Sequence, residues 1–409
     1  MDYRKLRSHA QLDAMVEQLE LRGRRQPLRG RPTKRILLLF SETFADGGIQ
    51  RFNRTFLAAC ERLEVVCDLY SLADSEATRP RWPTAASTSV RVFGRDKLRF
   101  VRAVARAIWS GGYDSVVVGH VHMLQLVVAV CAVKTFRRPR LMMIAHGVEV
   151  WTSVHGLRRR ALAAVDRILC VSGFTKQMIQ AQAPELGETR FTIFPNALSE
   201  TWIARQAIHG PARVDADFST HVPARFILSV ARLTRHDRTK GVIAVIEALA
   251  MLEQRDVHYV VAGRGDDMDF LRQTARRFDV ADRVHFLGAV TDEDLVCLYR
   301  RCCAFVLPSG QEGFGIVFLE AMYFGAPVIA AREKGAVDVV QDEETGLLVG
   351  FGDVIAIKNA IERVLRDSSL RDHIRERARQ TVTGHGAFTF DAFAARCAAL
   401  LDAPVSTTQ

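Results

Sequence analysis

The chain has no apolar run long enough to cross a lipid bilayer. Its longest apolar stretch, residues 123–133, is interrupted by Gln125 and ends at Lys134, whereas a membrane-spanning helix needs about 20 predominantly apolar residues. The first residues lead into no apolar core or small-residue cleavage site, so we expect no secretory signal.

Closely spaced cysteines are also missing. The eight cysteines are scattered, no Cys-x-x-Cys pair occurs, and Cys302 and Cys303 are adjacent. Disulfide frameworks and structural zinc sites both depend on recurrent cysteine spacings. We therefore predict neither of them, and we expect a reducing cytoplasm as the location.

Several functional signatures are absent as well. The chain has no Gly-x-Ser-x-Gly elbow, no Walker loop and no His-Glu-x-x-His, which argues against a serine hydrolase, a P-loop nucleotide hydrolase and a zinc protease. Because no aromatic-interleaved basic stripe accompanies the positive charge, we expect no nucleic-acid partner.

Acidic residues are outnumbered by basic ones, 46 to 56, so the formal net charge is +10. Residues 1–35 alone carry ten Lys and Arg against four Asp and Glu, and a further basic group comprises Lys97, Arg99, Arg102 and Arg106. Two interpretations stay open. The surplus is either a solvated basic surface or an attraction to anionic lipid, worth about 1 kcal/mol per basic residue near a membrane.

The composition is otherwise that of a soluble globular protein, with 48% hydrophobic and 25% charged residues in 409 positions. Apolar strand patterns alternate with helical patterns in two series, which predicts doubly wound α/β sheets. The first series has expected strands at 36–40, 65–70, 115–119, 141–145 and 167–171, and helices at 50–62, 98–109 and 156–164. The second has expected strands at 226–230, 257–262, 283–287, 304–307, 327–331 and 346–349, and helices at 242–252, 268–277 and 292–301.

These two series predict two Rossmann-like domains that face a central cleft, since ligands bind outside the carboxyl ends of such strands. The predicted divisions are a basic leader (1–34), an N-terminal domain (35–205), a C-terminal domain (206–385) and a C-terminal helix (386–402) that packs back on the N-terminal domain.

Residues 309–322 form the most informative segment. Glu312 and Glu320 stand eight positions apart, on either side of a glycine-flanked turn that leads into an apolar helix. Two such carboxylates can face one polyhydroxylated ligand, while the backbone N–H groups of 313–317 at the helix start can bind phosphate. The segment predicts a site for an anionic sugar ester.

Arg232 and Lys240 supply cations that suit a diphosphate. Arg232 follows the strand 226–230, and Lys240 opens the next helix. An arginine can donate two parallel hydrogen bonds to phosphate oxygens, and a lysine acts as a point charge. A pair of solvated surface cations is the alternative interpretation.

Two glycines and two aspartates follow another expected strand of the second series. Gly263 and Gly265 follow the strand 257–262, where we expect them to let backbone approach a ligand closely. The third glycine of a dinucleotide-binding fingerprint is absent. Asp267 and Asp269 mimic a metal motif, but acidic residues are also favoured in a helix's first turn, and we prefer that explanation.

In the first series, Gly47 and Gly48 lie in the loop after the opening strand, and three histidines stand at carboxyl ends of strands: His120, His122 and His146. They either face the cleft or are ordinary loop residues that have satisfied hydrogen bonds.

Taken in order, these motifs resemble the retaining glycosyltransferases of the GT-B fold, specifically the large family 4, the group 1 transferases. The resemblance begins near Arg35 and is strongest over residues 226–353. It rests on residues 47–48, 146–151, 171–172, 195–196, 229–233, 240–241, 262–265, 286–290, 308–320, 325–330, 344–349 and Asp353.

The resemblance implies a role for each candidate residue. Arg232 and Lys240 would neutralise the departing diphosphate, Glu312 would hold the transferred sugar, and Glu320 would accept hydrogen bonds from the ribose.

The implied catalytic residues are Arg232, Lys240, Glu312, His120, His122 and His146. The implied donor-binding residues are Gly47, Gly48, Gly263, Gly265, Val290, Gly313, Phe314, Gly315, Ile316 and Glu320. Because Arg232 and Lys240 are further apart than is common in the family, Arg235 or Arg238 could share the phosphate role. No metal or other cofactor is expected.

The implied activity is transfer of a hexose from a nucleoside-diphosphate sugar, UDP- or GDP-linked, to a glycan acceptor. Combined with the basic first domain, it predicts a lipid-linked acceptor in surface-polysaccharide or glycolipid biosynthesis, at the cytoplasmic face of the inner membrane. Transfer to a soluble small acceptor and a GT-B sugar-nucleotide epimerase are the alternatives; a dinucleotide oxidoreductase and a silent sugar-binding protein are disfavoured.

Overall fold

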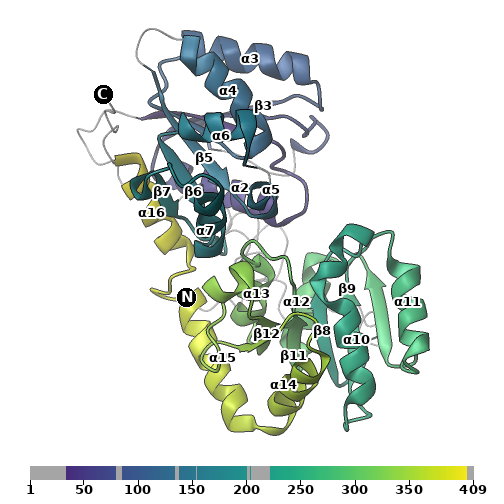
Figure 1. Cartoon of the computed structure of the whole chain (residues 1–409). Helices are drawn as coiled ribbons and strands as arrows, with labels where there is room; N and C mark the ends of the chain where they lie inside the picture. The colour runs from purple at the N-terminus through teal and green to yellow at the C-terminus, as the bar shows by residue number, and fades with distance from the viewer. Residues whose placement is uncertain are drawn as a thin grey trace, which may run out of the picture. The chain divides into compact units, whose positions relative to one another are not determined.

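The computed structural model describes residues 34–79, 85–133, 138–152, 154–199, 203 and 222–402. These residues form two compact units. The N-terminal unit comprises described residues up to Ser199 together with 390–402, and the C-terminal unit ends at Thr389 (Figure 1). The predicted basic leader, apart from Lys34, and the predicted boundary between residues 205 and 206 lie outside the described residues.

In the N-terminal unit, the described strands form one parallel sheet of seven with the order β3-β2-β1-β4-β5-β6-β7. The strands are β1 (Arg35–Phe40), β2 (Val66–Ser71), β3 (Thr88–Val92), β4 (Ser115–Val118), β5 (Arg140–Ala145), β6 (Arg167–Cys170) and β7 (Phe191–Ile193). The helices are α2 (Gly48–Arg62), α3 (Lys97–Ser110), α4 (Val121–Val133), α5 (Val148–Trp151), α6 (Gly156–Ala163) and α7 (Gly173–Gln182). Every residue of β4 and β5 is buried, which explains why all residues after the first in each strand are apolar.

In the C-terminal unit, the described strands form a parallel sheet of six with the order β10-β9-β8-β11-β12-β13. The strands are β8 (Phe226–Val230), β9 (His258–Ala262), β10 (Val284–Gly288), β11 (Ala304–Leu307), β12 (Val328–Ala331) and β13 (Leu347–Val349). The helices are α10 (Val242–Met251), α11 (Met268–Arg277), α12 (Asp292–Arg301), α13 (Ile316–Tyr323), α14 (Val354–Arg366) and α15 (Ser368–Val382), with 3₁₀ turns η5 (Arg235–Lys240) and η6 (Lys334–Asp338). Strand order reverses between β8 and β11, the topological switch point at which such sheets usually bind ligands.

The predicted fold class, two Rossmann-like α/β domains, is confirmed, and each of the eleven expected strands is present to within a residue or two. The sequence missed the two edge-region strands β3 and β7. β3 alternates exposed and buried residues and begins with Thr and Ser, while β7 has only three residues. Neither segment shows the buried apolar run that identified the other strands.

The last described helix, α16 (Phe390–Asp402), packs on α2 in the N-terminal unit. Phe393 lies among Phe52, Phe56 and Phe194, with ring centroids 5.6, 6.3 and 4.9 Å away. Arg140 Nη1 donates to the carbonyl of Leu400 at 2.7 Å. The chain thus returns to its first unit after completing the second. No helix within the described segments is long and apolar enough to cross a membrane.

Replacement of Phe393 by alanine should destabilise the N-terminal unit by about 3–5 kcal/mol, because the ring is fully buried and the change leaves a cavity. Denaturant unfolding of the full chain, followed by circular dichroism, measures the loss. Ala395→Ser on the exposed face of the same helix is the control, expected within about 0.5 kcal/mol of wild type. A loss below about 1 kcal/mol for Phe393→Ala would mean that α16 does not anchor the unit.

Candidate active site

Lys240 and Glu312 form an ion pair in the C-terminal unit. Lys240 ends η5, and Glu312 lies in the loop after β11, 72 residues later. Lys240 Nζ donates to Glu312 Oε2 at 2.8 Å, and their side chains are 18% and 14% exposed. The structure therefore brings together two predicted catalytic residues on opposite sides of the switch point.

A close backbone approach fixes the position of Lys240. Gly241 adopts the left-handed conformation, with φ of 80°, and a Cβ there would lie 2.4 Å from the carbonyl oxygen of Pro308. The N–H of Gly310 donates to the carbonyl of Thr239 at 2.7 Å. The segment after β8 is thus held directly against the segment after β11.

The predicted glycine turn precedes helix α13 as expected. Gly315 is the residue before the helix and has φ of 88°, a conformation that glycine adopts at little cost. The Phe314 ring is buried against Phe388, with ring centroids 5.7 Å apart. Since Ile316 is also buried, residues 313–316 can meet a ligand mainly through their backbone N–H groups.

The two glutamates have different surroundings. Glu312 is partly exposed beside Lys240, whereas Glu320, on α13, is only 1% exposed. Tyr299 Oη, from α12, donates to Glu320 Oε2 at 3.0 Å. The sequence did not single out Tyr299, since a tyrosine in an amphipathic helix gives no signal of a buried carboxylate partner. Contact of Glu320 with a ribose stays a prediction.

Arg232 is the more exposed of the two predicted diphosphate-binding cations. Its side chain is 80% exposed and Nη2 lies 3.2 Å from Asp237 Oδ1. Arg238 instead donates two hydrogen bonds, 2.7 and 2.6 Å long, to the buried Asp267 and covers the ring of Phe270 at 3.8 Å. That arrangement argues against a phosphate role for Arg238. It also explains Asp267 as an ion-pair partner, in addition to its place before a helix.

Backbone packing explains Gly263 and Gly265, and their predicted contact with the donor stays a prediction. A Cβ on Gly263 would lie 1.8 Å from the carbonyl oxygen of Ala231, and one on Gly265 would lie 2.1 Å from Leu233 backbone atoms. Neighbouring backbone, rather than a ligand, occupies the space that these glycines leave. Val290 lies partly buried between β10 and α12, and its contact with the donor stays a prediction.

In the N-terminal unit, His146 is a buried histidine. Its Nε2 lies 3.1 Å from the carbonyl oxygen of Gly119, and its ring packs edge-on against Phe52 at 5.1 Å. Its backbone N–H donates to Glu149 Oε1 at 2.6 Å. Burial lowers the pKa of His146 to about 4, so the imidazole is neutral at physiological pH.

His120 and His122 stack, with ring centroids 4.7 Å apart and planes inclined by 18°. Arg158 Nη2 lies 2.9 Å from His122 Nδ1. Burial, together with the neighbouring His122 and Arg158, lowers the pKa of His120 to about 4. A neutral His120 can hydrogen-bond a sugar but cannot supply positive charge to a diphosphate.

The loop before Gly47 is held by the buried Asp74. Its Oδ2 accepts hydrogen bonds from the N–H of Thr43 at 2.7 Å and from Ser71 Oγ at 2.6 Å. Gly47 has φ of 147° and precedes α2, in which Gly48 is the first residue. A Cβ on Gly47 would lie 2.3 Å from Gln50 Oε1. Because the Gln50 side chain can move away, the φ of 147° rather than this contact explains Gly47 structurally, while a donor contact stays a prediction.

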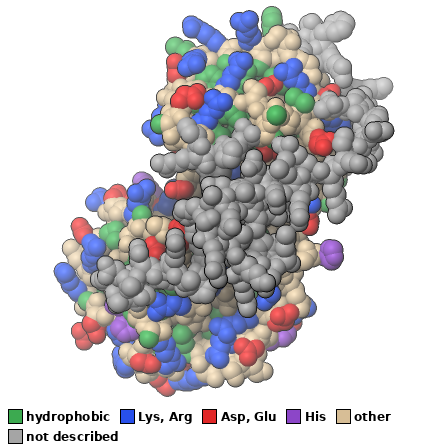
Figure 2. Space-filling model, turned by 180° about the vertical axis from the view of Figure 1, so that it is seen from behind, with side chains coloured by type: hydrophobic (Ala, Val, Ile, Leu, Met, Phe, Trp, Pro, Cys, Tyr) green, Lys and Arg blue, Asp and Glu red, His purple; other side chains and the backbone are tan. Residues whose placement is uncertain are grey.

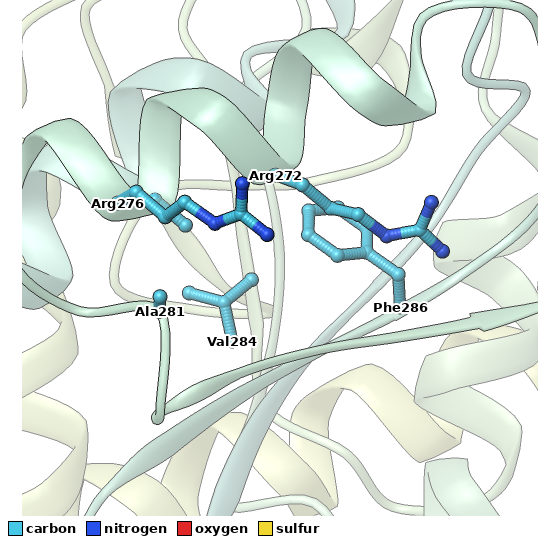
Figure 3. A pocket seen from close by; sticks show the side chains of 6 residues that line it. Arg272, Arg276, Ala281, Val284 and Phe286 are labelled. Carbon is cyan, nitrogen blue, oxygen red and sulfur yellow. The ribbon is translucent and has the colours of Figure 1, made fainter.

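A hollow elsewhere in the C-terminal unit contains none of the predicted site residues. It lies between α11 and the edge strand β10 and is lined by Arg272, Ala275, Arg276, Ala281, Val284 and Phe286 (Figure 3). Among the described residues, no group of three or more His, Cys, Asp or Glu side chains is placed to hold a metal ion.

Comparison with known proteins gives matches along most of the chain. A model of Glycosyltransferase Family 4 matches residues 46–201, and a model of Glycosyl transferases group 1 matches residues 216–381. An uncharacterized glycosyltransferase of Methanocaldococcus jannaschii is 35% identical over 159 residues, which are 39% of this chain and 40% of that protein. A lipopolysaccharide core biosynthesis glycosyltransferase of Rhizobium meliloti is 32% identical over 169 residues, 41% and 48% of the two chains. The chain thus spans less than half the length of these relatives.

Solved structures share the fold across both units. A glycosyltransferase from Rickettsia africae superimposes with a TM-score of 0.71 at 16% identity, covering 92% of this chain and 100% of that one. An Anabaena protein crystallised with UDP and glucose gives a TM-score of 0.68 at 19% identity, covering 90% and 99%. At such identities the likeness establishes the GT-B fold alone.

The stability of the N-terminal unit should fall as the pH drops from about 6.5 toward 4. His146 has a folded-state pKa below its unfolded value of about 6.5, so the unfolded chain binds the proton first and acid favours unfolding. The full effect is about 3 kcal/mol. His146→Gln should reduce the pH dependence of the unfolding free energy over this range, with His120, whose pKa is also lowered to about 4, accounting for part of the rest, whereas the exposed His155→Gln should leave it unchanged. Equal slopes for wild type and His146→Gln would contradict the assignment.

Proposed function

Because the chain belongs to the family 4, or group 1, glycosyltransferases and has their GT-B fold, we propose that it is a retaining hexosyltransferase. It moves a sugar from a nucleoside-diphosphate sugar to a glycan acceptor. The observation that carries this proposal is the ion pair of Lys240 and Glu312 beside the start of α13. Lys240, a cation suited to the diphosphate, directly contacts Glu312, a carboxylate suited to sugar hydroxyls.

The charges of this site suit the reaction. As the bond between sugar and diphosphate breaks, negative charge grows on the diphosphate, and fixed cations and N–H dipoles directed at it lower the barrier. Lys240 and the more exposed Arg232 supply the cations. The backbone N–H groups near Gly315 supply the dipoles, because the first N–H groups of a helix lack partners within it.

Both UDP- and GDP-linked sugars are donors to test. An Anabaena neighbour was crystallised with UDP-glucose, and a Mycobacterium tuberculosis relative, 29% identical over 280 residues, is named as a GDP-mannose-dependent mannosyltransferase acting on a phosphatidylinositol mannoside.

We propose a lipid-linked acceptor, reached from the cytoplasmic face of the inner membrane. On α3, Leu98 and Trp109 are 69% and 63% exposed, although both are large apolar side chains. The basic residues of the same helix, Lys97, Arg99, Arg102 and Arg106, are exposed too. Figure 2 shows hydrophobic and basic side chains together at the end of the N-terminal unit where α3 lies. Such a helix suits an anionic lipid surface.

A soluble acceptor remains the alternative. A Salinispora arenicola relative, 36% identical over 162 residues, is named as a D-inositol 3-phosphate glycosyltransferase. This alternative would be favoured if the protein transferred sugar to soluble acceptors and did not bind lipid vesicles.

Thermal unfolding in the presence of nucleotide sugars identifies the donor, since a ligand that binds the folded state raises the melting temperature. With that donor, Lys240→Ala should lower turnover by about 10²–10³-fold, the usual effect of removing one group that stabilises the transition-state charge. Lys358→Ala is the matched control. Lys358 also pairs with a glutamate, Glu362, at 2.9 Å and is 19% exposed, but it lies on α14. Wild-type turnover in folded Lys240→Ala would overturn the site assignment.

Reversal of charge on α3 tests the membrane surface. Changing Lys97, Arg99, Arg102 and Arg106 to Glu should abolish binding to vesicles that contain anionic lipid, because each basic residue contributes about 1 kcal/mol there. Reversing four exposed arginines of the other unit is the control: Arg272, Arg276, Arg277 and Arg301. Vesicle sedimentation measures both. Equal loss of binding in the two variants would mean that overall charge, and not α3, is responsible.

A further inference from the structure

The ion pair of Lys240 and Glu312 joins two groups that the proposed function assigns to different parts of the donor. Lys240 is to bind the diphosphate, and Glu312 is to bind hydroxyls of the sugar. In this structure each is the partner of the other, at 2.8 Å. Both side chains are largely buried, with 18% and 14% exposed. A ligand that binds one of them therefore competes with the other for it.

Backbone hydrogen bonds hold the segments on both sides of the pair, which leaves side-chain rotation as the way to separate it. Beside Lys240, the carbonyl of Thr239 accepts a hydrogen bond from Gly310 at 2.7 Å. Beside Glu312, its own carbonyl accepts one from Gly335 at 2.9 Å. A Cβ on Gly335 would lie 2.1 Å from the carbonyl oxygen of Gly313, so these two segments are already in contact.

The other cation of the site has no comparable constraint. The Arg232 side chain is 80% exposed, and its contact with Asp237 is 3.2 Å long. Although the Asp237 side chain is only 11% exposed, the guanidinium lies in solvent, and solvent screening keeps the free-energy contribution of such a pair small. Binding of the diphosphate therefore costs free energy mainly because it weakens the partly buried ion pair of Lys240 and Glu312.

From this arrangement we propose that Glu312 makes the site discriminate between the sugar nucleotide and the free nucleoside diphosphate. The inference rests on the proposed function. A diphosphate that binds Lys240 competes with Glu312 for the cation and places a second anion beside that carboxylate. A partly buried carboxylate that loses its partner is costly.

Only a ligand that carries a sugar replaces the lost partner, because its hydroxyl groups can donate to the carboxylate. The donor is thus favoured, and the nucleoside diphosphate left after transfer is bound weakly and released. Specificity arises here from an unfavourable interaction with the wrong ligand as well as a favourable one with the right ligand.

The experiment compares wild type with Glu312→Gln by calorimetric titration with UDP, GDP, UDP-glucose and GDP-mannose. Glutamine removes the charge and keeps the size. We expect Glu312→Gln to bind the nucleoside diphosphate about tenfold more tightly, in line with the coupling of close charge pairs. Binding of the corresponding sugar nucleotide should not tighten, so the preference for donor over product should fall by about the same factor.

The chain offers a matched control in Glu362→Gln. Glu362 pairs with Lys358 at 2.9 Å, with 7% and 19% of the two side chains exposed, on a helix that carries no predicted site residue. This variant should leave the affinities for all four ligands unchanged. In a Lys240→Met background, Glu312→Gln should lose the part of its effect that comes from competition for Lys240 and keep the part that comes from repulsion between the two anions.

The outcomes separate the two proposals. If wild type binds and turns over a sugar nucleotide but folded Glu312→Gln binds the nucleoside diphosphate no more tightly, the discrimination by Glu312 is overturned while the proposed function stands. If wild type binds none of the four ligands, the donor class itself is wrong, and the inference fails with it. Glu312→Ala serves as a second variant should Glu312→Gln not fold, and it should shift the affinity for nucleoside diphosphate in the same direction.

Discussion

Backbone segments at the carboxyl end of the second sheet contact one another with no side chain between them. A Cβ on Gly241, Gly263 or Gly335 would come within 2.4 Å of a carbonyl oxygen of another segment. These glycines follow β8, β9 and β12 and join the loops of separate strands into one surface. The side chains on that surface, Lys240 and Glu312 among them, take their positions from these contacts.

The charged side chains on this surface differ in how strongly an acidic partner holds them. Arg232 extends into solvent, whereas Lys240 is held by Glu312 and Arg238 is held by the buried Asp267. In the low dielectric of a partly buried site, an ion pair costs more to break than it does in water. In the donor-binding site that we propose, the contact between Lys240 and Glu312 therefore links recognition of the diphosphate to recognition of the sugar.

In the N-terminal unit, one aromatic cluster connects the end of the chain to a candidate catalytic residue. The Phe52 ring contacts both Phe393 of α16 and the imidazole of His146, at 5.6 and 5.1 Å. Helix α16 thus helps to keep water from the ring that touches His146, and burial is the main cause of the low pKa of that histidine.

The sequence by itself determined the two parallel sheets, because strands covered on both faces must be continuously apolar. It also placed Lys240, Glu312 and the turn at Gly315 in one series of motifs. Only the tertiary structure decided which partners these residues have. It paired Lys240 with Glu312, Glu320 with Tyr299 and Arg238 with Asp267, and it filled the space beside Gly263 with backbone. Such contacts join residues 21 to 72 positions apart, and their geometry depends on strand order and loop packing, which local spacing does not encode.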